Sequence, residues 1–207
     1  MTLGRVIRDF ASPDVAPMGI TWDGAALWVV THGDTPAMWR VDPATGTGKW
    51  AFDTDVAENG LCWDGRTLWT ANWKVQQLRQ YDPATGTLIR ILATDVVWPM
   101  GVAWDGRHLL VPGGWFLRIY RVDPNTGTSV LPLLPPGGTP GDLCWDGAHV
   151  WHCDYDTERV YQLEVITATM VRYFNAPDVD PFSVTWDGRT LWVCDDVADR
   201  IYQIAVN

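Results

Sequence analysis

The chain has 207 residues, of which 47% are apolar and 19% are charged, so it can build a packed core and is not of the disordered class. It carries 25 acidic residues against 15 lysines and arginines, and this net charge of −10 excludes nucleic acids and anionic membranes as expected partners, because both require a basic surface. The first nine residues lack the apolar segment of a secretory signal, which predicts a cytoplasmic protein, and the four cysteines are too few for a disulfide scaffold.

The first predicted strand covers residues 5–10, and its sequence RVIRDF matches TMVRYF at residues 169–174. The match continues from PDVAP at residues 13–17 to PDVDP at residues 177–181, again 164 residues further along the chain. A constant offset of this length indicates that the N-terminal strand is the last strand of a repeated unit.

The repeat is marked by the triplet Trp-Asp-Gly, which recurs every 41 residues. Its tryptophans are Trp22, Trp63, Trp104, Trp145 and Trp186. Each unit has four short strand-like segments, exemplified by residues 19–22, 27–30, 119–122 and 88–92. Asp-Gly follows the first segment, and an Asp-Pro-x-Thr-Gly turn such as residues 42–46 follows the third, where proline fixes φ and glycine accepts a positive φ. Four strands in about 41 residues are typical of one propeller blade.

These elements predict an all-β fold, a five-bladed β-propeller with four antiparallel strands per blade. The N-terminal strand completes the C-terminal blade, so the fifth blade is split between residues 1–10 and 182–207. Closing the ring in this way removes the exposed sheet edges that promote aggregation. We expect residues 1–207 to form one domain and the protein to be a monomer.

The topology separates two ends of the disc, and acidic residues concentrate at one of them. The turn end carries the repeated Trp-Asp-Gly and Asp-Pro-x-Thr-Gly turns, whereas the loop end carries connections that differ between blades. Against one base, Lys74, the loop end holds Asp14, Asp34, Asp53, Asp55, Glu58, Asp95, Asp142, Asp154, Asp156, Glu158, Asp178, Asp180, Asp195, Asp196 and Asp199. We expect the resulting negative potential to attract a cation at the mouth of the central channel; the alternative is that these acids are simply solvated loop residues.

Aromatic residues are also predicted at the loop end. The candidate ligand-binding residues there are His32, Asn72, Trp73, Trp98, Trp115, Tyr155, Phe182 and Asp195. Aromatic rings among carboxylates can hold an ammonium group by cation–π attraction, or can stack on sugar rings. The alternative is that they cover their neighbours. Trp39 and Trp50, on the third and fourth strands of their blade, are instead expected to pack within the blade.

One column of the repeat supplies oxygen atoms at the ends of the second strands. It holds Thr31, Asn72, Gly113, Asp154 and Asp195. If these side chains converge on the axis, they suit Ca²⁺ better than zinc, and Asp142 is a further candidate ligand beside Asp154 and Asp195. No zinc-like spacing of Cys or His occurs, and the thiols are expected to be buried. His152 occupies a column that is otherwise Val or Thr, so it is either a core histidine with a partner or a catalytic residue.

The second repeat resembles a known family. Residues 68–86, LWTANWKVQQLRQYDPATG, resemble the Trp-Ala-Asn-x-Trp segment of plant-type and bacterial glutamine cyclotransferases, and residues 58–61, ENGL, resemble the family's Thr-Gln-Gly-Leu. The resemblance implies a five-bladed propeller that cyclises N-terminal glutamine, with Asn72 and Trp73 in the substrate pocket. The strand position of the family's catalytic glutamate holds no carboxylate here, and its Trp-Pro-Lys segment has no counterpart, so the resemblance supports the fold and an amine-accepting pocket more than the reaction.

Three functions remain open from the sequence. The first is a binding propeller whose acidic, aromatic-lined pocket takes a cationic amine, a peptide or a metal-bound small ligand. The second is a glutamine cyclotransferase-type enzyme in which Glu58, Asp154 or His152 transfers the proton. The third is a scaffold or engineered repeat without a ligand, which the constant spacing of 41 residues favours.

Overall fold

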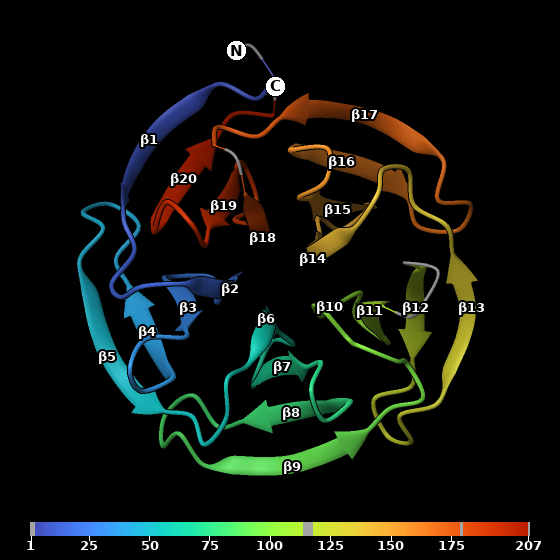
Figure 1. The fold of residues 1–207 in the computed structure, drawn as a ribbon, viewed down its shortest axis with the longest axis horizontal. Helices are drawn as coiled ribbons and strands as arrows, with labels where there is room; N and C mark the ends of the chain where they lie inside the picture. The colour runs from blue at the N-terminus through green and yellow to red at the C-terminus, as the bar shows by residue number, and fades with distance from the viewer. Residues whose placement is uncertain (1–2, 114–117, 179, 207) are drawn as a thin grey trace.

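The computed structural model describes residues 3–113, 118–178 and 180–206, and for residue 131 it describes the backbone alone. Five four-stranded antiparallel sheets surround a central axis as blades, each with its first strand innermost (Figure 1). The predicted five-bladed propeller is therefore confirmed. Within the described ranges no segment is a helix, and accordingly no helix of sufficient length and apolarity to span a membrane is found.

The strands of each blade follow one another outwards from the axis. Blade 1 contains β2 (Pro17–Trp22), β3 (Leu27–Thr31), β4 (Ala37–Val41) and β5 (Gly48–Asp53). Blade 2 contains β6 (Asn59–Trp63), β7 (Leu68–Asn72), β8 (Gln77–Tyr81) and β9 (Leu88–Ala93). Blade 3 contains β10 (Ala103–Trp104), β11 (Leu109–Gly113), β12 (Arg118–Val122) and β13 (Ser129–Leu133). Blade 4 contains β14 (Pro140–Trp145), β15 (His149–Asp154), β16 (Arg159–Glu164) and β17 (Met170–Asn175). Blade 5 contains β18 (Pro181–Trp186), β19 (Leu191–Asp195), β20 (Arg200–Ile204) and, from the N-terminus, β1 (Val6–Ala11).

The N-terminal strand closes the ring as predicted. β1 pairs antiparallel with β20, and Phe10 lies opposite Ile201. Phe10 also packs against Trp192, with ring centroids 5.8 Å apart. Strand β1 thus covers the edge of β20, which would otherwise present unpaired backbone groups to solvent.

The Trp-Asp-Gly turns are held by their aspartates. In blade 1, Asp23 Oδ1 accepts hydrogen bonds from Ala25 N and Ala26 N, and Oδ2 accepts one from Trp28 Nε1. Burial alone would raise the pKa of Asp23, but these hydrogen bonds outweigh it and lower the pKa. Gly24 has a φ of 97°, a conformation that explains the glycine of the triplet.

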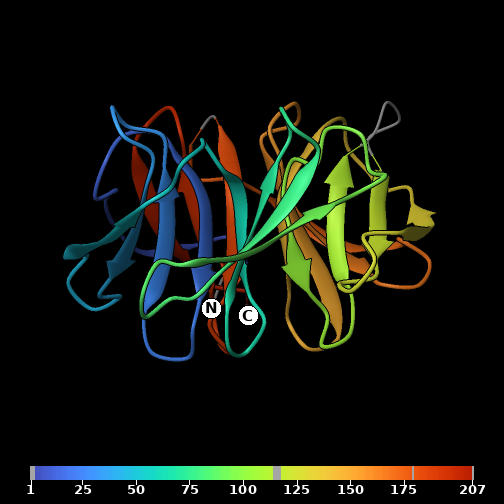
Figure 2. The same ribbon diagram turned by 90° about the horizontal axis from the view of Figure 1, so that it is seen from below.

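The core lies between blades rather than at the axis. Each of five apolar clusters joins neighbouring blades, as where Val29 and Val41 of blade 1 pack with Trp192 and Ile201 of blade 5. A side view shows the loop end at the top and the turn end, with both termini, at the bottom (Figure 2). The interlocked blades thus form a rigid support for the connections of the loop end.

Candidate functional site

The axis is closed by a hydrogen-bonded pair that joins all five blades. Asp142 of blade 4 accepts hydrogen bonds from Leu61 N of blade 2 (3.2 Å), Val102 N of blade 3 (2.8 Å) and Ser183 Oγ of blade 5 (2.5 Å). Ser183 Oγ in turn accepts one from Ile20 N of blade 1 (2.9 Å). Both side chains are completely buried, so this pair cross-links the innermost strands. We call it the axial pair.

The surroundings of the axial pair explain its chemistry. Burial raises the pKa of Asp142 to about 7, although the hydrogen bonds from Ser183, Val102 and Leu61 oppose the shift. A side chain at Gly101 would place its Cβ 2.3 Å from Asp142 Oδ1, so the glycine makes room for the carboxylate. Because protein donors already occupy both oxygens of Asp142, its observed role is structural.

The two carboxylates of the predicted column of oxygen ligands accept hydrogen bonds from the backbone of neighbouring loops. Asp154 accepts hydrogen bonds from Gly138 N (2.8 Å) and Thr157 N (2.9 Å), and Asp195 accepts them from Asp180 N (2.9 Å) and Ala198 N (2.7 Å).

Asn72 makes the same kind of link, because its amide donates to Ala57 O (2.9 Å) and accepts from Lys74 N (3.1 Å). Each of the three side chains thus ties the two loop-end connections of its own blade together. Across residues 3–113, 118–178 and 180–206, no three His, Cys, Asp or Glu side chains lie close enough to hold a metal ion, so Asp142, Asp154 and Asp195 do not form a shared site.

The predicted aromatic ligand residues differ in their exposure. Trp73 and Trp98 are 38% and 40% exposed, whereas Tyr155 is half-buried and Phe182 is buried in β18. The Lys74 ammonium lies 5.6 Å from the centre of the Trp73 ring, so this ring already has a cation. Trp115 lies outside the described residues.

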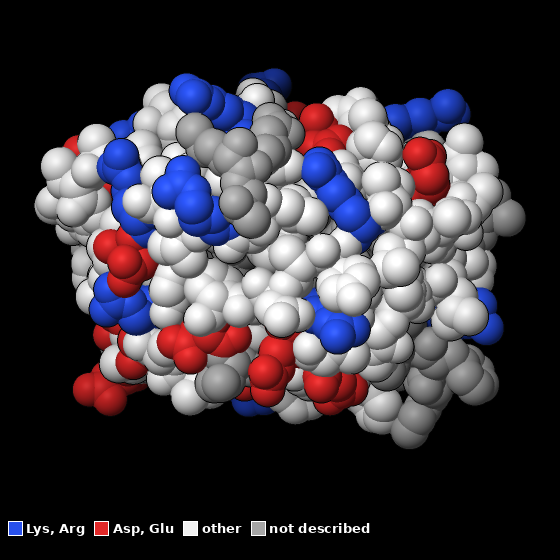
Figure 3. All heavy atoms as spheres, turned by 90° about the horizontal axis from the view of Figure 1, so that it is seen from above, with Lys and Arg blue, Asp and Glu red and all other residues white. Residues whose placement is uncertain are grey.

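Carboxylates gather at the loop end, as predicted from the sequence. In Figure 3, where the loop end is at the bottom, acidic side chains follow the lower edge and most Lys and Arg lie above them. The crowding affects titration, because burial and then repulsion by Asp180 raise the pKa of Asp196 to about 6. Burial, followed by repulsion from Asp195 and Glu158, also raises the pKa of Asp180. Burial is thus the main cause of both shifts, and the neighbouring carboxylates add to it.

A hollow that combines acids with aromatic rings lies at the edge of blade 1. It has a volume of about 490 Å³. Its lining consists of Asp14, Val15, Asp34, Thr35, Ala37, Trp39, Trp50 and Asp53. We call it the acid–indole hollow. The sequence interpretation placed an acidic, aromatic-lined pocket at the loop-end mouth of the channel, whereas this hollow lies at the outer edge of a blade.

Strand pairing brings the two indoles of the hollow together. Trp39 of β4 lies opposite Trp50 of β5, and Trp50 is 53% exposed, so the expectation that it packs in the interior is wrong. The indole N–H of Trp50 donates to Asp53 Oδ1 (2.9 Å), and that of Trp39 donates to Thr31 Oγ1 (3.1 Å). Both indole N–H groups are thus already bonded, and the two rings line the hollow with their carbon atoms.

The loop residues of the hollow are brought together by a close approach. A side chain at Gly33 would place its Cβ 2.4 Å from Asp14 Oδ2, so glycine allows the β1–β2 and β3–β4 connections to pack. Asp34 is exposed and Asp53 is exposed, and no basic residue lines the hollow. Three carboxylates therefore face one small volume.

A second polar cluster is buried in blade 2 around Glu58. Tyr81 Oη donates to Glu58 Oε1 (2.8 Å), and Arg79 Nε lies 3.5 Å from the same oxygen. Arg79 also pairs with Asp55 (2.6 Å), and His32 Nε2 lies 2.7 Å from Glu58 O. Burial raises the pKa of Glu58 to about 7, and Tyr81 and Arg79 oppose the shift. Glu58 Oε2 has no partner within the described residues.

Comparison of the repeats shows that blade 2 is distinct at this cluster. The Glu58 position is proline in the other blades, at Pro17, Pro99, Pro140 and Pro181. The Arg79 position is aromatic, at Trp39, Tyr120, Tyr161 and Tyr202. The Tyr81 position is aliphatic, at Val41, Val122, Leu163 and Ile204. These three substitutions contact one another, and the repeat columns were the signal that could have identified Arg79 and Tyr81 from the sequence.

His152 lies in the core of blade 4. Its ring stacks on Tyr161, its Nδ1 lies 3.2 Å from Cys153 O, and burial lowers its pKa to about 4. Its Nε2 has no partner among the described residues. The ring is fully buried and uncharged at neutral pH, as expected for a core histidine. The four cysteines are buried free thiols, as expected.

Comparison of the sequence with models of known families finds no match, and comparison with curated proteins finds none either. Among solved structures, a glutaminyl cyclase of Myxococcus xanthus aligns with a TM-score of 0.83 and 13% identity, covering 97% of this chain and 95% of that one. A nidogen/laminin complex gives a TM-score of 0.66 and 17% identity, covering 94% of this chain and 77% of that chain. A mitotic checkpoint complex gives a TM-score of 0.61 and 11% identity, covering 99% of this chain and 96% of that chain. At these identities the likeness establishes the fold, and it confirms the predicted resemblance to glutamine cyclotransferases at that level.

Proposed function

We propose that this chain binds a small organic cation in the acid–indole hollow. The observation that carries the proposal is the lining itself: the carboxylates of Asp14, Asp34 and Asp53 and the indoles of Trp39 and Trp50 surround about 490 Å³. Carboxylates attract a positive charge, and aromatic faces stabilise a desolvated ammonium group by cation–π attraction. An alkylated ammonium suits this lining better than a metal ion, because it gains from both kinds of group.

The charge of the whole loop end supports the same ligand class. The acidic edge seen in Figure 3 extends the negative potential beyond the hollow, which raises the local concentration of cations. Binding should therefore weaken as ionic strength rises, because exposed charges are screened over about 10 Å at 0.1 M salt.

Calorimetric titration with tetramethylammonium at low salt tests the proposal. We expect saturable binding that Trp50→Leu weakens about tenfold, because the cation loses one aromatic face. Asp34→Asn should weaken it by about threefold, since Asp34 makes no hydrogen bond within the described residues and its replacement removes charge alone.

Matched variants elsewhere at the loop end separate the acid–indole hollow from the rest of that end. Trp98→Leu and Glu158→Gln remove an exposed ring and an exposed carboxylate from the loop end but not from the hollow. We expect both variants to bind tetramethylammonium with the affinity of the unaltered chain. If they lose binding while Trp50→Leu retains it, the ligand lies outside the acid–indole hollow and the proposal is wrong.

A second candidate function is favoured by the Glu58 cluster. A buried carboxylate with a pKa near 7 can take up and release a proton at neutral pH, as general acid–base catalysis requires. We infer that, if the chain is a glutamine cyclotransferase-type enzyme, Glu58 moves the proton from the attacking amine to the departing ammonia. Glu58 is fully buried, so this function also requires the Thr54–Glu58 connection to open.

Incubation with a glutamine-initiated peptide, followed by mass spectrometry for loss of ammonia, tests this function. Glu58→Gln should lower the rate by at least about a hundredfold. Asp154→Asn should retain the rate, because Asp154 binds its own loop. No ammonia loss with the unaltered protein would exclude the enzyme, and no binding of any organic cation would leave the scaffold function.

A further inference from the structure

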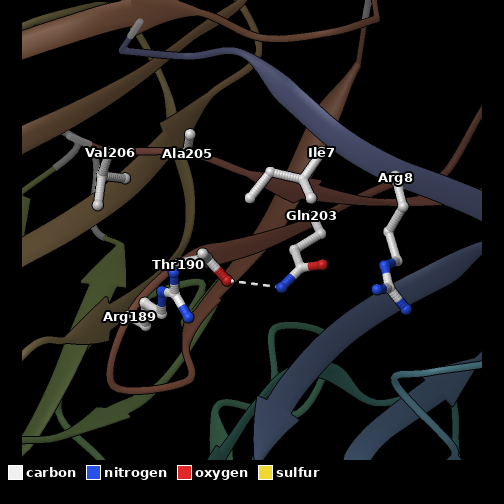
Figure 4. A pocket seen from close by; sticks show the side chains of 7 residues that line it. All are labelled: Ile7, Arg8, Arg189, Thr190, Gln203, Ala205 and Val206. Atoms are coloured by element: carbon white, nitrogen blue, oxygen red, sulfur yellow. Dashed lines mark hydrogen bonds between the residues drawn. The ribbon is translucent and has the colours of Figure 1, made fainter. Parts of the chain in front are cut away.

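A second hollow lies on the flank of blade 5 at the turn end. It also has a volume of about 490 Å³, and its lining consists of Ile7, Arg8, Arg189, Thr190, Gln203, Ala205 and Val206. We call it the seam hollow, because β1 and β20 meet there. Figure 4 shows Gln203 between Arg189 and Arg8, with its amide directed to Thr190.

Blades 2 and 4 have an arginine at the repeat position of Arg8, namely Arg90 and Arg172. Arg90 Nε donates to Gln80 Oε1 (2.8 Å), and its guanidinium lies 4.8 Å from the centre of the Trp69 ring. In blade 4, Arg172 Nε donates to Gln162 Oε1 in the same way (2.7 Å). Each of these arginines thus binds the glutamine of its own blade through Nε, and Arg172 also donates through Nη1 to Val206 O of blade 5 (2.8 Å).

Blade 5 has the equivalent residues in a different arrangement. Arg8 donates through Nη1 to Pro43 O and Ala44 O of blade 1, both at 2.9 Å. Gln203 donates to Thr190 Oγ1 (3.0 Å), and no bond joins it to Arg8. The strand register is the same in the three blades, because Arg8 lies opposite Gln203 as Arg90 lies opposite Gln80 and Arg172 opposite Gln162, so the difference lies in the side chains. The Nε and Nη2 groups of Arg8 thus have no partner in the described part of the chain.

The charge of the seam hollow is opposite to that of the loop end. No acidic residue lines it, and the guanidinium of Arg189 has no partner among the residues described. The nearby Asp187 is already engaged by Thr190 Oγ1 (2.6 Å) and Trp192 Nε1 (2.8 Å). In a chain of net charge −10, two arginines without an acidic neighbour in the hollow form a local site for an anion.

The remaining wall of the seam hollow is aliphatic. Ile7 is 37% exposed, and Ala205 and Val206 form buried floor residues. Such a wall contacts alkyl groups but offers no hydrogen bond. We propose that the seam hollow binds a short aliphatic carboxylate, with the carboxylate on Arg8 and Arg189 and the alkyl chain on Ile7 and Val206.

Calorimetric titration of the full chain with butanoate at low salt tests the proposal. We expect a dissociation constant of about 1 mM, which is suitable for so small a ligand. Arg189→Gln should weaken binding about tenfold, because it removes one of the two charges. The fold should survive, since only the backbone N–H of Arg189 supports the turn, through Asp187.

Arg66→Gln is the matched control, because Arg66 occupies the same turn position in blade 2 and is exposed. We expect it to bind butanoate unchanged, and we expect butylamine not to bind at the seam hollow. Absence of saturable butanoate binding, or equal loss in the Arg66 and Arg189 variants, overturns the proposal. Cation binding in the acid–indole hollow is unaffected by either result.

Discussion

Single buried polar side chains determine how the blades of this propeller are joined. Asp142 and Ser183 replace glycine at the axis, where the other blades have Gly19, Gly60 and Gly101. The glycines of three blades leave room for the side chains of Asp142 and Ser183. These two side chains then bond to one another and to backbone N–H groups of the other three blades. The stability of the ring should depend strongly on Asp142, since backbone groups of two other blades have their partner there.

The first prediction concerns that carboxylate. Asp142→Ala should lower the free energy of unfolding by about 3 kcal/mol, because it leaves Leu61 N and Val102 N buried without acceptors. Urea denaturation measures the change. Asp34→Ala, at an exposed position, should change it by less than about 0.5 kcal/mol. Equal stability of both variants would contradict the cross-linking role.

The second prediction concerns the pH dependence of stability at Glu58. Its pKa is raised from 4.5 to about 7, so the folded chain keeps a proton that the unfolded chain has lost. The stabilising contribution is complete below pH 4.5 and is lost as the pH rises through 7. Between pH 5 and 7 the unaltered chain should lose up to about 1.4 kcal/mol per pH unit relative to Glu58→Gln. Parallel stability curves for the two proteins would show that Glu58 does not titrate in this range.

Residue-level prediction from the sequence identifies candidate residues but not their contacts, which depend on register and loop conformation. Glu58 was selected because residues 58–61 resemble a segment of the glutamine cyclotransferases, and its role remains a prediction. Trp50 was assigned to packing, because its position opposite Trp39 follows from a register shift next to Met38 that no sequence pattern reveals. The hydrogen bonds of Asp154 and Asp195 to their own loops likewise depend on how each connection folds back.

At the scale of elements, the repeated turns made the strands predictable. Blade 3 is the exception, since β10 covers only Ala103–Trp104 whereas an inner strand from residue 101 was expected by analogy. Pro112 of the neighbouring β11 has no N–H to donate, which shortens the ladder between the two strands. Local chemistry thus modifies an element that the repeat pattern alone predicts to be regular.

The third prediction concerns strand β1. Phe10→Ala should lower the free energy of unfolding by about 3 kcal/mol, because its ring packs on Trp192 within the core between blades 5 and 1. Val6→Ala, on the exposed side of the same strand, should change it by less than about 0.5 kcal/mol. Thermal unfolding monitored by tryptophan fluorescence compares the two. Equal effects would mean that β1 does not close the ring through this contact.

At the scale of the whole molecule, the propeller separates charge between its two ends. Three of the loop-end acids line the acid–indole hollow, and the arginines of the seam hollow lie at the turn end. The sequence predicted this concentration of acids because the repeat fixes which connections share an end. It could not predict where a hollow forms, since that depends on packing between the β1–β2 and β3–β4 connections.

The proposed binding of an organic cation in the acid–indole hollow can be tested directly by nuclear magnetic resonance. The indole N–H signals in ¹H–¹⁵N spectra report on each tryptophan during titration with tetramethylammonium. We predict saturable shifts of the Trp39 and Trp50 signals, while those of Trp73 and Trp98 stay in place. Shifts of Trp73 and Trp98 alone, or no saturable shift of any indole signal, would contradict the claim.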